Sequence, residues 1–493
     1  MKLKFVVFLA FLGLAALCAA DSADVKPLST NKTLTTTELV AWLAGGVSNS
    51  RLVRLVGERG LAAAPGKDEL RQLQSAGADE NLLRLLGSVK IPASTADAPI
   101  SPALLKAAGA AAKQNYHEAE LQLREALRAD PQNGALHFAL SAMLRQQDQW
   151  DDAFDEITLS LQLQPDFPEN HGSLSYIFYR MDDGQNAVSE ARTALSMDPE
   201  NSEAYQYLGL GLYSSGEYSA AIHAFAQSLL RDPENADSYY DMGIALHAAG
   251  NLPAALAAYE RAIGLRPDFW EAHSNLALTL HEEGKLDQAV AEYREAKKLA
   301  PEEASIRNNL GNTYCDQGKF DEAITELREL YKQHPEWQEG HGCLASALMA
   351  KKDYESAVAE LQLALQQNPS GATEHRVLGQ ALLLDGKPEE ALRELRLAVS
   401  LNPDSDVAHH YLGTVLFEQQ QLQAAEKEFR EALRLKPSAD NHYSLAACLM
   451  SLDRYEEALS ELDLASRLDP ERTLYRARRE ELLRLMKATN SAR

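Results

Sequence analysis

Residues 271–301 read EAHSNLALTLHEEGKLDQAVAEYREAKKLAP, and residues 305–335 read SIRNNLGNTYCDQGKFDEAITELRELYKQHP. The second stretch follows the pattern of the first at one constant offset, with two apolar-periodic segments, a turn containing glycine, and a final proline. Apolar residues at three- and four-residue steps are typical of helices, and proline ends a helix because it lacks the amide hydrogen. Each stretch therefore predicts a hairpin of two helices.

The same hairpin recurs along most of the chain. Its closing prolines follow one another at a constant spacing, with the last one residue early, at Pro131, Pro165, Pro199, Pro233, Pro267, Pro301, Pro335, Pro369, Pro403, Pro437 and Pro470. An alanine precedes each proline by twelve residues, at Ala119, Ala153, Ala187, Ala221, Ala255, Ala289, Ala323, Ala357, Ala391, Ala425 and Ala458. A second row of small residues lies upstream, at Ala107, Ser141, Ser175, Gly209, Gly243, Ala277, Gly311, Ala345, Gly379, Gly413 and Ala446. These rows predict that two helices meet closely in every unit.

This pattern of small, aromatic and proline positions resembles the tetratricopeptide repeat (TPR) family. The resemblance implies an all-α, right-handed superhelical solenoid, with eleven helix-turn-helix repeats over residues 100–472. Such repeats are stabilised by stacking on their neighbours, so the last one needs a cap with a polar outer face. We expect residues 473–487 to form that capping helix, with Leu474 and Leu482 on its apolar side, and residues 488–493 to be a disordered tail.

The start of the chain predicts export. Residues 1–20, MKLKFVVFLAFLGLAALCAA, combine two lysines, a short apolar run and small residues, which is typical of a secretory signal peptide. We expect cleavage after Ala20 and a periplasmic or secreted protein, although retention of this segment as an anchor stays open. A lipid anchor through Cys18 is disfavoured by the bulky Leu17.

Between the signal peptide and the repeats we predict three further segments. Residues 21–33 are polar and expected to be disordered. Thr35 and Glu38 form a plausible capping box at the start of a small, separate helical module over residues 34–90. Residues 91–99, IPASTADAP, read as the linker from that module to the repeats.

Composition excludes several classes of function. The net charge of −24 disfavours nucleic acid and anionic lipid, and no later stretch is apolar enough for stable membrane insertion. Only three cysteines follow the signal peptide, an odd number that cannot form a full disulfide framework, so we expect packing to supply the stability. No HExxH, paired CxxC or phosphate-binding loop is present, and the glycines of Gly209–Gly211 lie within a helix. We expect no catalytic residue, cofactor or metal.

The candidate binding residues lie on the first helices, because in the TPR family these helices line the concave surface. Tyrosines offer rigid amphipathic surface for a peptide, although some of them are equally well explained as packing between helices. The predicted aromatic row consists of Tyr176, Tyr179, Tyr207, Tyr213 and Tyr240.

A row of asparagines follows in the next repeats. Asn275 and Asn309 hold equivalent places, with Asn308 and Asn312 beside the latter, and amides can both donate to and accept from a peptide backbone. This stretch resembles the repeats that precede the catalytic domain of O-linked N-acetylglucosamine transferases. The equivalent places hold Asp241 before these asparagines and Cys343 after them, so only two amides align.

Three other rows have simpler explanations. The carboxylates Glu169, Glu203, Asp237, Glu271 and Glu339 could attract a basic ligand, but each is expected in the first turn of a helix, where the dipole favours it anyway. The row His247, His281, Cys315 and Met349 contains copper-ligand types, but adjacent helices lie too far apart for more than a neighbouring pair such as His281 and Cys315 to converge. We include His247 and His281 as groove residues. Seven histidines at one repeat position are interpreted as packing residues: His137, His171, His273, His341, His375, His409 and His442.

Together these features predict a non-catalytic, exported scaffold whose concave face, chiefly between the third and seventh repeats, binds a peptide or protein segment and organises an envelope complex. One alternative is a non-catalytic subunit or targeting module of a glycosyltransferase-type enzyme supplied by a partner chain. Another is a metal-binding array. The oligomeric state stays open.

Overall fold

The computed structural model describes residues 33–89 and 99–491, and every regular element within them is a helix. One isolated β-bridge joins Leu34 and Leu61. The predicted signal peptide lies outside the described residues, as do all but the last residue of the 21–33 segment and of the 91–99 linker. Among the described helices, none combines the length and the apolar character that a membrane span requires.

The chain divides into two compact units, residues 1–279 and 280–493, with the boundary inside α16. The helices that begin in the first unit are α2 (Thr36–Ala44), α3 (Asn49–Arg59), α4 (Lys67–Ser75), α5 (Glu80–Ser88), α6 (Pro102–Ala111), α7 (Tyr116–Ala129), α8 (Gly134–Arg145), α9 (Trp150–Leu163), α10 (Pro168–Arg180), α11 (Gly184–Met197), α12 (Ser202–Ser214), α13 (Tyr218–Arg231), α14 (Ala236–Ala248), α15 (Leu252–Leu265) and α16 (Trp270–Glu282). Those of the second are α17 (Leu286–Leu299), α18 (Ala304–Asp316), α19 (Phe320–Gln333), α20 (His341–Ala350), α21 (Tyr354–Gln367), α22 (Ala372–Leu384), α23 (Pro388–Leu401), α24 (Asp406–Glu418), α25 (Leu422–Leu435), α26 (Ala439–Ser451), α27 (Tyr455–Leu468) and α28 (Thr473–Ser491).

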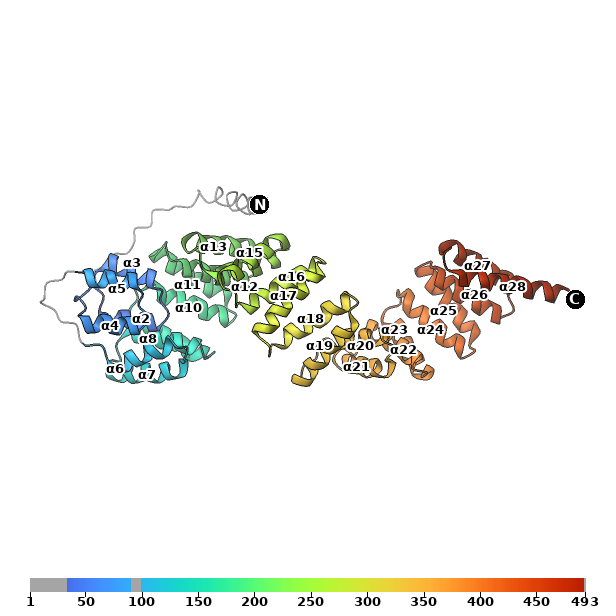
Figure 1. The fold of residues 1–493 in the computed structure, drawn as a ribbon, viewed down its shortest axis with the longest axis horizontal. Coiled ribbons are helices and arrows are strands. Elements are labelled where there is room, and N and C mark those ends of the chain that lie inside the picture. The colour runs from blue at the N-terminus through green and yellow to red at the C-terminus, as the bar shows by residue number, and fades with distance from the viewer. Residues whose placement is uncertain (1–32, 90–98, 492–493) are drawn as a thin grey trace. The chain divides into compact units, whose positions relative to one another are not determined.

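From α6 to α27 the helices form consecutive hairpins, which Figure 1 shows stacking one after another within each unit. The alanine row is the contact between the two helices of a hairpin, because all eleven of its alanines are fully buried. The upstream row of small residues is buried as well. Where that row holds a serine, its hydroxyl donates to the carbonyl of the partner alanine: Ser141 to Ala153 and Ser175 to Ala187, both at 2.7 Å. The predicted close contact is confirmed.

The turn inside each hairpin has one residue in the left-handed region. Glycine holds this place at Gly216, where φ is +77°, and an ordinary residue such as Lys352, at +64°, holds it elsewhere. A side chain in this region costs roughly 1–2 kcal/mol, so glycine is the favoured residue.

The four N-terminal helices pack directly on the first repeats, so the expectation of a separate module is not confirmed. Trp42 stacks on Phe167 with ring centroids 4.3 Å apart, and Phe138 meets the edge of Phe167 at 5.5 Å. The apolar side chains of α2–α5 and of α6–α10 belong to one hydrophobic core. The capping box at Thr35 and Glu38 is present, and a second oxygen of Glu38 accepts a hydrogen bond from Gln164 at 2.9 Å.

The C-terminal helix differs from the prediction in two ways. It buries Tyr475 and Leu482, whereas Leu474 is 45% exposed, so the apolar side begins one residue later than expected. It also runs to Ser491 instead of ending at residue 487, because residues 488–491 contain no glycine or proline to stop it.

The sequence left open whether any pair of cysteines is oxidised. A disulfide joins Cys315 on α18 to Cys343 on α20, with Cα atoms 6.5 Å apart, and Cys448 is free and buried. An odd number of cysteines rules out pairing all of them but leaves room for one bridge. The disulfide links two adjacent repeats of the second unit.

Candidate functional site

Adjacent first helices meet through a fixed relationship between two positions. In two pairs of adjacent first helices, a residue near the end of one contacts the residue 28 places later, on the next. Arg145 donates to the Ser173 hydroxyl at 3.2 Å in this way, and the disulfide between Cys315 and Cys343 occupies the equivalent place. Tyr179 and Tyr207 hold these two positions in the next pair of helices. We call the surface that carries these two rows the first-helix face.

Tyr176 is the centre of an aromatic group on the first-helix face. Its half-buried ring lies 6.0 Å from the ring of Tyr179 and 5.4 Å from that of Tyr207. The Arg145 guanidinium lies 5.2 Å from the Tyr176 centroid, which is within the range of a cation–π contact. The tyrosines of α10 and α12 therefore form one continuous patch.

Asp241 on α14 adds a carboxylate beside this patch. Its Oδ2 accepts a hydrogen bond from Gln206 Nε2 at 2.7 Å. Burial raises the pKa of Asp241 to about 7, against the opposing effect of the Gln206 hydrogen bond. Burial and the charge of Asp241 also raise the pKa of Tyr179. We call Tyr176, Tyr179, Tyr207, Tyr240 and Asp241 the tyrosine cluster.

Tyr240 and Tyr213 have more structural roles than predicted. The Tyr240 ring packs on Phe269 at 4.7 Å, and its hydroxyl accepts a hydrogen bond from Asn275 Nδ2 at 3.1 Å. Tyr213 contacts Tyr218 of the following helix, with centroids 5.6 Å apart. Both residues are half-buried. Each ring therefore packs between helices on one side and stays accessible to a ligand on the other.

Of the remaining predicted residues, Asn275 contacts the tyrosine cluster through its hydrogen bond to Tyr240. His247 is half-buried at the end of α14, and the His281 Nε2 lies 2.7 Å from Asp316 Oδ2. Asn308 is 4% exposed and donates weakly to Asn309 at 3.4 Å, and Asn312 is half-buried. Asn275 belongs to the first unit and Asn309 to the second. The hydrogen bond from Asn275 to Tyr240 already occupies one donor of the first amide.

Two members of the acidic row, Glu169 and Asp237, are paired internally. Arg51 of α3 forms a buried ion pair with Glu169 and lies 2.8 Å from Asp198, and Asp237 pairs with Arg266 at 2.7 Å. The prediction that Glu339 lies in a first helical turn was wrong, because Gly340, with φ of +89°, delays the start of α20 to His341.

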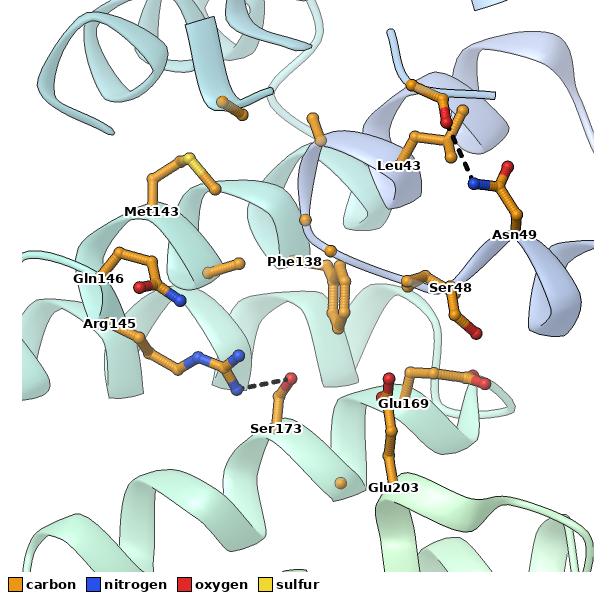
Figure 2. Close-up of a pocket in the computed structure, with 18 of the residues that line it drawn as sticks. Leu43, Ser48, Asn49, Phe138, Met143, Arg145, Gln146, Glu169, Ser173 and Glu203 are labelled. Atoms are coloured by element: carbon orange, nitrogen blue, oxygen red, sulfur yellow. Dashed lines mark hydrogen bonds between the residues drawn. The ribbon is translucent and has the colours of Figure 1, made fainter. Parts of the chain in front are cut away.

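Glu203 of the same row lies on α12. Among the described residues it forms no ion pair and no hydrogen bond with another side chain. Burial, and next the charge of Glu169, raise its pKa to about 7. It points into a cavity of about 500 Å³ between the N-terminal helices and α8–α12, which Figure 2 shows in close-up.

The seven histidines are more than packing residues. Nδ1 of six of them lies within hydrogen-bonding distance of a glutamate nineteen residues later, at 2.5–2.7 Å; the pairs are His137–Glu156, His171–Glu190, His341–Glu360, His375–Glu394, His409–Glu428 and His442–Glu461. Each pair joins the first helix of a hairpin to its second. Within the described parts of the chain no group of three or more His, Cys, Asp or Glu side chains could hold a metal ion, and Cys315 is committed to the disulfide.

Comparison with protein families decides the class of this repeat. A model described as "Tetratricopeptide repeat" matches residues 104–166, 174–236, 208–268, 240–304, 308–372 and 344–406, which together exceed half of the chain. The chain belongs to the tetratricopeptide repeat family. A second model, "Anaphase-promoting complex, cyclosome, subunit 3", matches residues 394–465. No curated protein sequence matches the chain.

Several solved structures are similar in fold to this TPR protein. MamA from Desulfovibrio magneticus RS-1 is 19% identical over 34% of this chain and 94% of its own, with a TM-score of 0.33. A chain of the Cut9–Hcn1 hetero-tetramer of the APC/C is 14% identical over 79% of this chain and 91% of its own, with a TM-score of 0.40. A tetratricopeptide repeat protein from Parabacteroides merdae ATCC 43184 is 16% identical over 50% of this chain and 98% of its own, with a TM-score of 0.39. At these identities the likeness concerns the fold alone.

Sequence reasoning missed the residues by which the N-terminal helices reach the TPR array. Arg51 pairs with Glu169, the Arg54 guanidinium donates to the Glu200 carbonyl at 3.1 Å, and that of Arg59 donates to the Asp166 carbonyl at 2.8 Å. These three arginines lie on one helix at three- to five-residue steps, which was a visible signal of a basic face. TPR repeats serve protein–protein interaction, and here the first of them already hold a segment of their own chain.

Proposed function

We propose that this chain is an exported, non-catalytic TPR scaffold that binds a peptide or protein segment on the first-helix face of α10, α12 and α14 and organises an envelope protein complex. The observation that carries the proposal is the tyrosine cluster. Tyr176, Tyr179 and Tyr207 form one patch, and the Asp241 carboxylate lies beside it.

The chemistry of the cluster suits a peptide. Tyrosine rings supply large contact areas and lose little rotational freedom on binding. Asp241 has one hydrogen bond from Gln206, and its carboxylate can accept another from a ligand amide or a basic side chain. The net charge of −24 favours a basic or neutral segment and disfavours nucleic acid.

Two observations support export. Residues 1–20 have the composition of a secretory signal peptide. The disulfide between Cys315 and Cys343 is a bond that persists in oxidising compartments and is rare in the cytosol. Mass spectrometry of the N-terminus in fractionated cells tests this part, because retention of residue 1 on a cytosolic protein contradicts it.

The second candidate is a non-catalytic subunit of a glycosyltransferase-type enzyme whose activity belongs to a partner chain. It rests on the resemblance of the Asn275 and Asn309 positions to the repeats of O-linked N-acetylglucosamine transferases. The Asn275 amide donates to Tyr240, which makes it part of the same face as the tyrosines. Co-purification of sugar-transferring activity that is lost on Asn275→Ala and Asn309→Ala would favour this candidate.

The experiment that tests the main proposal compares two sets of tyrosine variants. Tyr176→Ala, Tyr179→Ala and Tyr240→Ala together should remove a partner that the wild-type chain retains from envelope extract. Tyr354→Ala with Tyr455→Ala is the matched control, since both residues begin second helices. An unchanged set of partners in the first variant contradicts the proposal.

A further inference from the structure

Asp241 is a half-buried carboxylate that pairs with no cation among the described residues. Its Oδ2 accepts one hydrogen bond, from Gln206 at 2.7 Å, whereas its Oδ1 has no partner in the described chain and remains accessible to solvent. Arg266 acts on Asp241 only through its charge, because its guanidinium donates two hydrogen bonds to Asp237, at 2.7 and 3.3 Å. A carboxylate held away from water without a cation costs free energy. The free protein therefore gains no stability from this charge.

The surroundings of Asp241 are aromatic. Burial, and next the charge of Asp241, raise the pKa of the hydroxyls of both Tyr179 on α10 and Tyr240 on α14, so both rings lie close to the carboxylate. Tyr213 on α12 and Asp241 hold the two positions, 28 residues apart, that are in contact in two other pairs of first helices. All three tyrosines are half-buried and so keep accessible surface. Three consecutive first helices thus each place a tyrosine beside one carboxylate.

The chain itself shows how an arginine is held by a ring and a carboxylate. The guanidinium carbon of Arg266 lies 3.5 Å from the centroid of the Phe269 ring, and the same guanidinium donates to Asp237. The ring faces the flat side of the cation while the carboxylate accepts from its edge. Asp241 and its tyrosines offer the same two kinds of group on an accessible face, but no arginine of the described chain pairs with them.

We propose that Asp241 and the tyrosines beside it bind the guanidinium group of an arginine in a partner peptide. The edge of the guanidinium donates to Asp241, and its flat face lies on a tyrosine ring. Arginine suits this arrangement because its guanidinium is planar, always charged and more weakly hydrated than an ammonium group. The inference deepens the proposed function and rests on it, since it names the side chain by which the partner segment is recognised.

Other occupants fit these groups less well. Within the described residues no group of three or more metal-ligand side chains could hold a metal ion. An anion is repelled by the Asp241 carboxylate and by the net charge of −24. A neutral amide could donate to Asp241 but would leave its charge uncompensated. A lysine ammonium is a strongly hydrated point charge and has no flat face to stack on a ring.

Protonation of Asp241 couples arginine binding to pH. Burial raises the pKa of this carboxyl to about 7. The groups that face it are Gln206 of α12, Asp237 and Tyr240 of α14, Arg266 after α15 and Tyr179 of α10. Binding requires the carboxylate, and arginine stays charged throughout, so affinity should rise about ten-fold between pH 6 and pH 8 and then level off. Asp241→Asn should remove this dependence.

The test is isothermal titration of the full chain at pH 8 with the peptide acetyl-Gly-Ala-Arg-Ala-Gly amide. We expect binding that weakens by about ten-fold or more when citrulline, the neutral analogue, replaces arginine, and also in the Asp241→Asn variant. Asp268→Asn, the same change at an exposed aspartate of the following loop, should bind like wild type. No binding of the arginine peptide, equal binding of the citrulline peptide, or a lysine peptide that binds as tightly overturns the proposal.

The stability of Asp241→Asn separates a binding role from a structural one. Asparagine keeps an acceptor for Gln206 and removes the uncompensated charge, so the variant should unfold at a higher temperature than the wild-type chain at pH 8. At pH 5, where Asp241 is protonated, the two chains should unfold alike. A variant that unfolds at a lower temperature at pH 8 shows that the carboxylate stabilises the fold, and contradicts the proposal.

The outcome is separable from that of the proposed function. Asp241→Asn leaves every tyrosine in place, and it should lose the envelope partner that the Tyr176, Tyr179 and Tyr240 variant loses. If Asp241→Asn retains that partner, the proposed function stands and arginine recognition fails. If the tyrosine variant retains its partner while the arginine peptide binds the wild-type chain, the proposed function fails and recognition of the guanidinium group is supported.

Discussion

The Nδ1 atom of His137 lies 2.5 Å from Glu156 Oε2, and its Nε2 atom lies 3.1 Å from the Pro131 carbonyl oxygen. A carboxylate and a carbonyl both only accept hydrogen bonds, so these two contacts favour the charged imidazole, in which both ring nitrogens carry hydrogen. The hydrogen bond to Glu156 raises the pKa of His137, outweighing the opposing effect of burial. The same two contacts recur at His375 and His409.

The His137 contact predicts a pH-dependent stability. Because the folded pKa is raised, the contribution is complete below the unfolded pKa of about 6.5 and is lost as the pH rises through the higher folded value. His137→Gln should lower the free energy of unfolding by about 1–2 kcal/mol at pH 5.5 and by less at pH 8.5. Urea unfolding at both pH values measures the difference. His117→Gln, on an exposed histidine, should change neither value.

The histidine–glutamate pairs were present in the sequence as a correlation between repeats. Wherever the first position holds histidine, glutamate stands nineteen residues later. Where it holds Tyr205 or Tyr239, the later residue is Ala224 or Ala258. Hairpin geometry brings the two positions together in every repeat. Comparing the repeats of one chain therefore reveals the correlated pair, as an alignment of related proteins would.

Gly209 should tolerate no side chain. A Cβ there would lie 2.5 Å from the Phe225 ring, which is fully buried and cannot move aside. Gly209→Ala should cost about 1–3 kcal/mol through overpacking. Gly264, in an exposed part of α15 with open space around it, is the control, and Gly264→Ala should stabilise by about 0.5–1 kcal/mol. Equal effects of the two substitutions on chemical denaturation would contradict this packing.

The disulfide should stabilise the second unit. Closing a loop between residues 28 apart restricts the unfolded chain and typically contributes about 2–4 kcal/mol. Cys315→Ser with Cys343→Ser should therefore unfold at a lower temperature than the oxidised wild-type chain. Dithiothreitol should lower the wild-type midpoint and leave that of the double variant unchanged. If dithiothreitol lowers the unfolding midpoints of the wild-type chain and of the double variant equally, loss of the disulfide is not the cause of the wild-type shift.

Glu203 predicts a stability effect that depends on pH through a carboxyl group. A carboxyl whose folded pKa is about 7 retains its proton between pH 4.5 and 7, where the unfolded chain has lost it, so its contribution to stability falls as the pH rises through this window. Glu203→Gln should be more stable than wild type at pH 8, by roughly 1–3 kcal/mol. Near pH 4 the two chains should unfold alike, and a constant difference across the range would exclude the shifted pKa.

The fold could be predicted from the spacing of residues in the sequence, whereas much of the candidate site could not. The constant spacing of the prolines and small residues was enough to predict the hairpins, since the same small residues must meet in each of them. Arg51 reaches Glu169 across 118 residues, and no periodicity predicts a contact between α3 and a repeat. Glu203 and Glu169 are equivalent in the sequence, yet only one of them is paired. That difference arises because Arg51 of α3 pairs with Glu169 and not with Glu203.

The central claim, that a partner segment binds at the tyrosine cluster, is tested most directly by site-specific crosslinking in cells. A photoreactive phenylalanine at position 179 should crosslink to a discrete partner, and Tyr176→Ala with Tyr240→Ala should abolish that crosslink. The same probe at position 354, on a second helix, should give none. Equal crosslinking at both positions, or a crosslink at position 179 that survives both alanine substitutions, would contradict the claim.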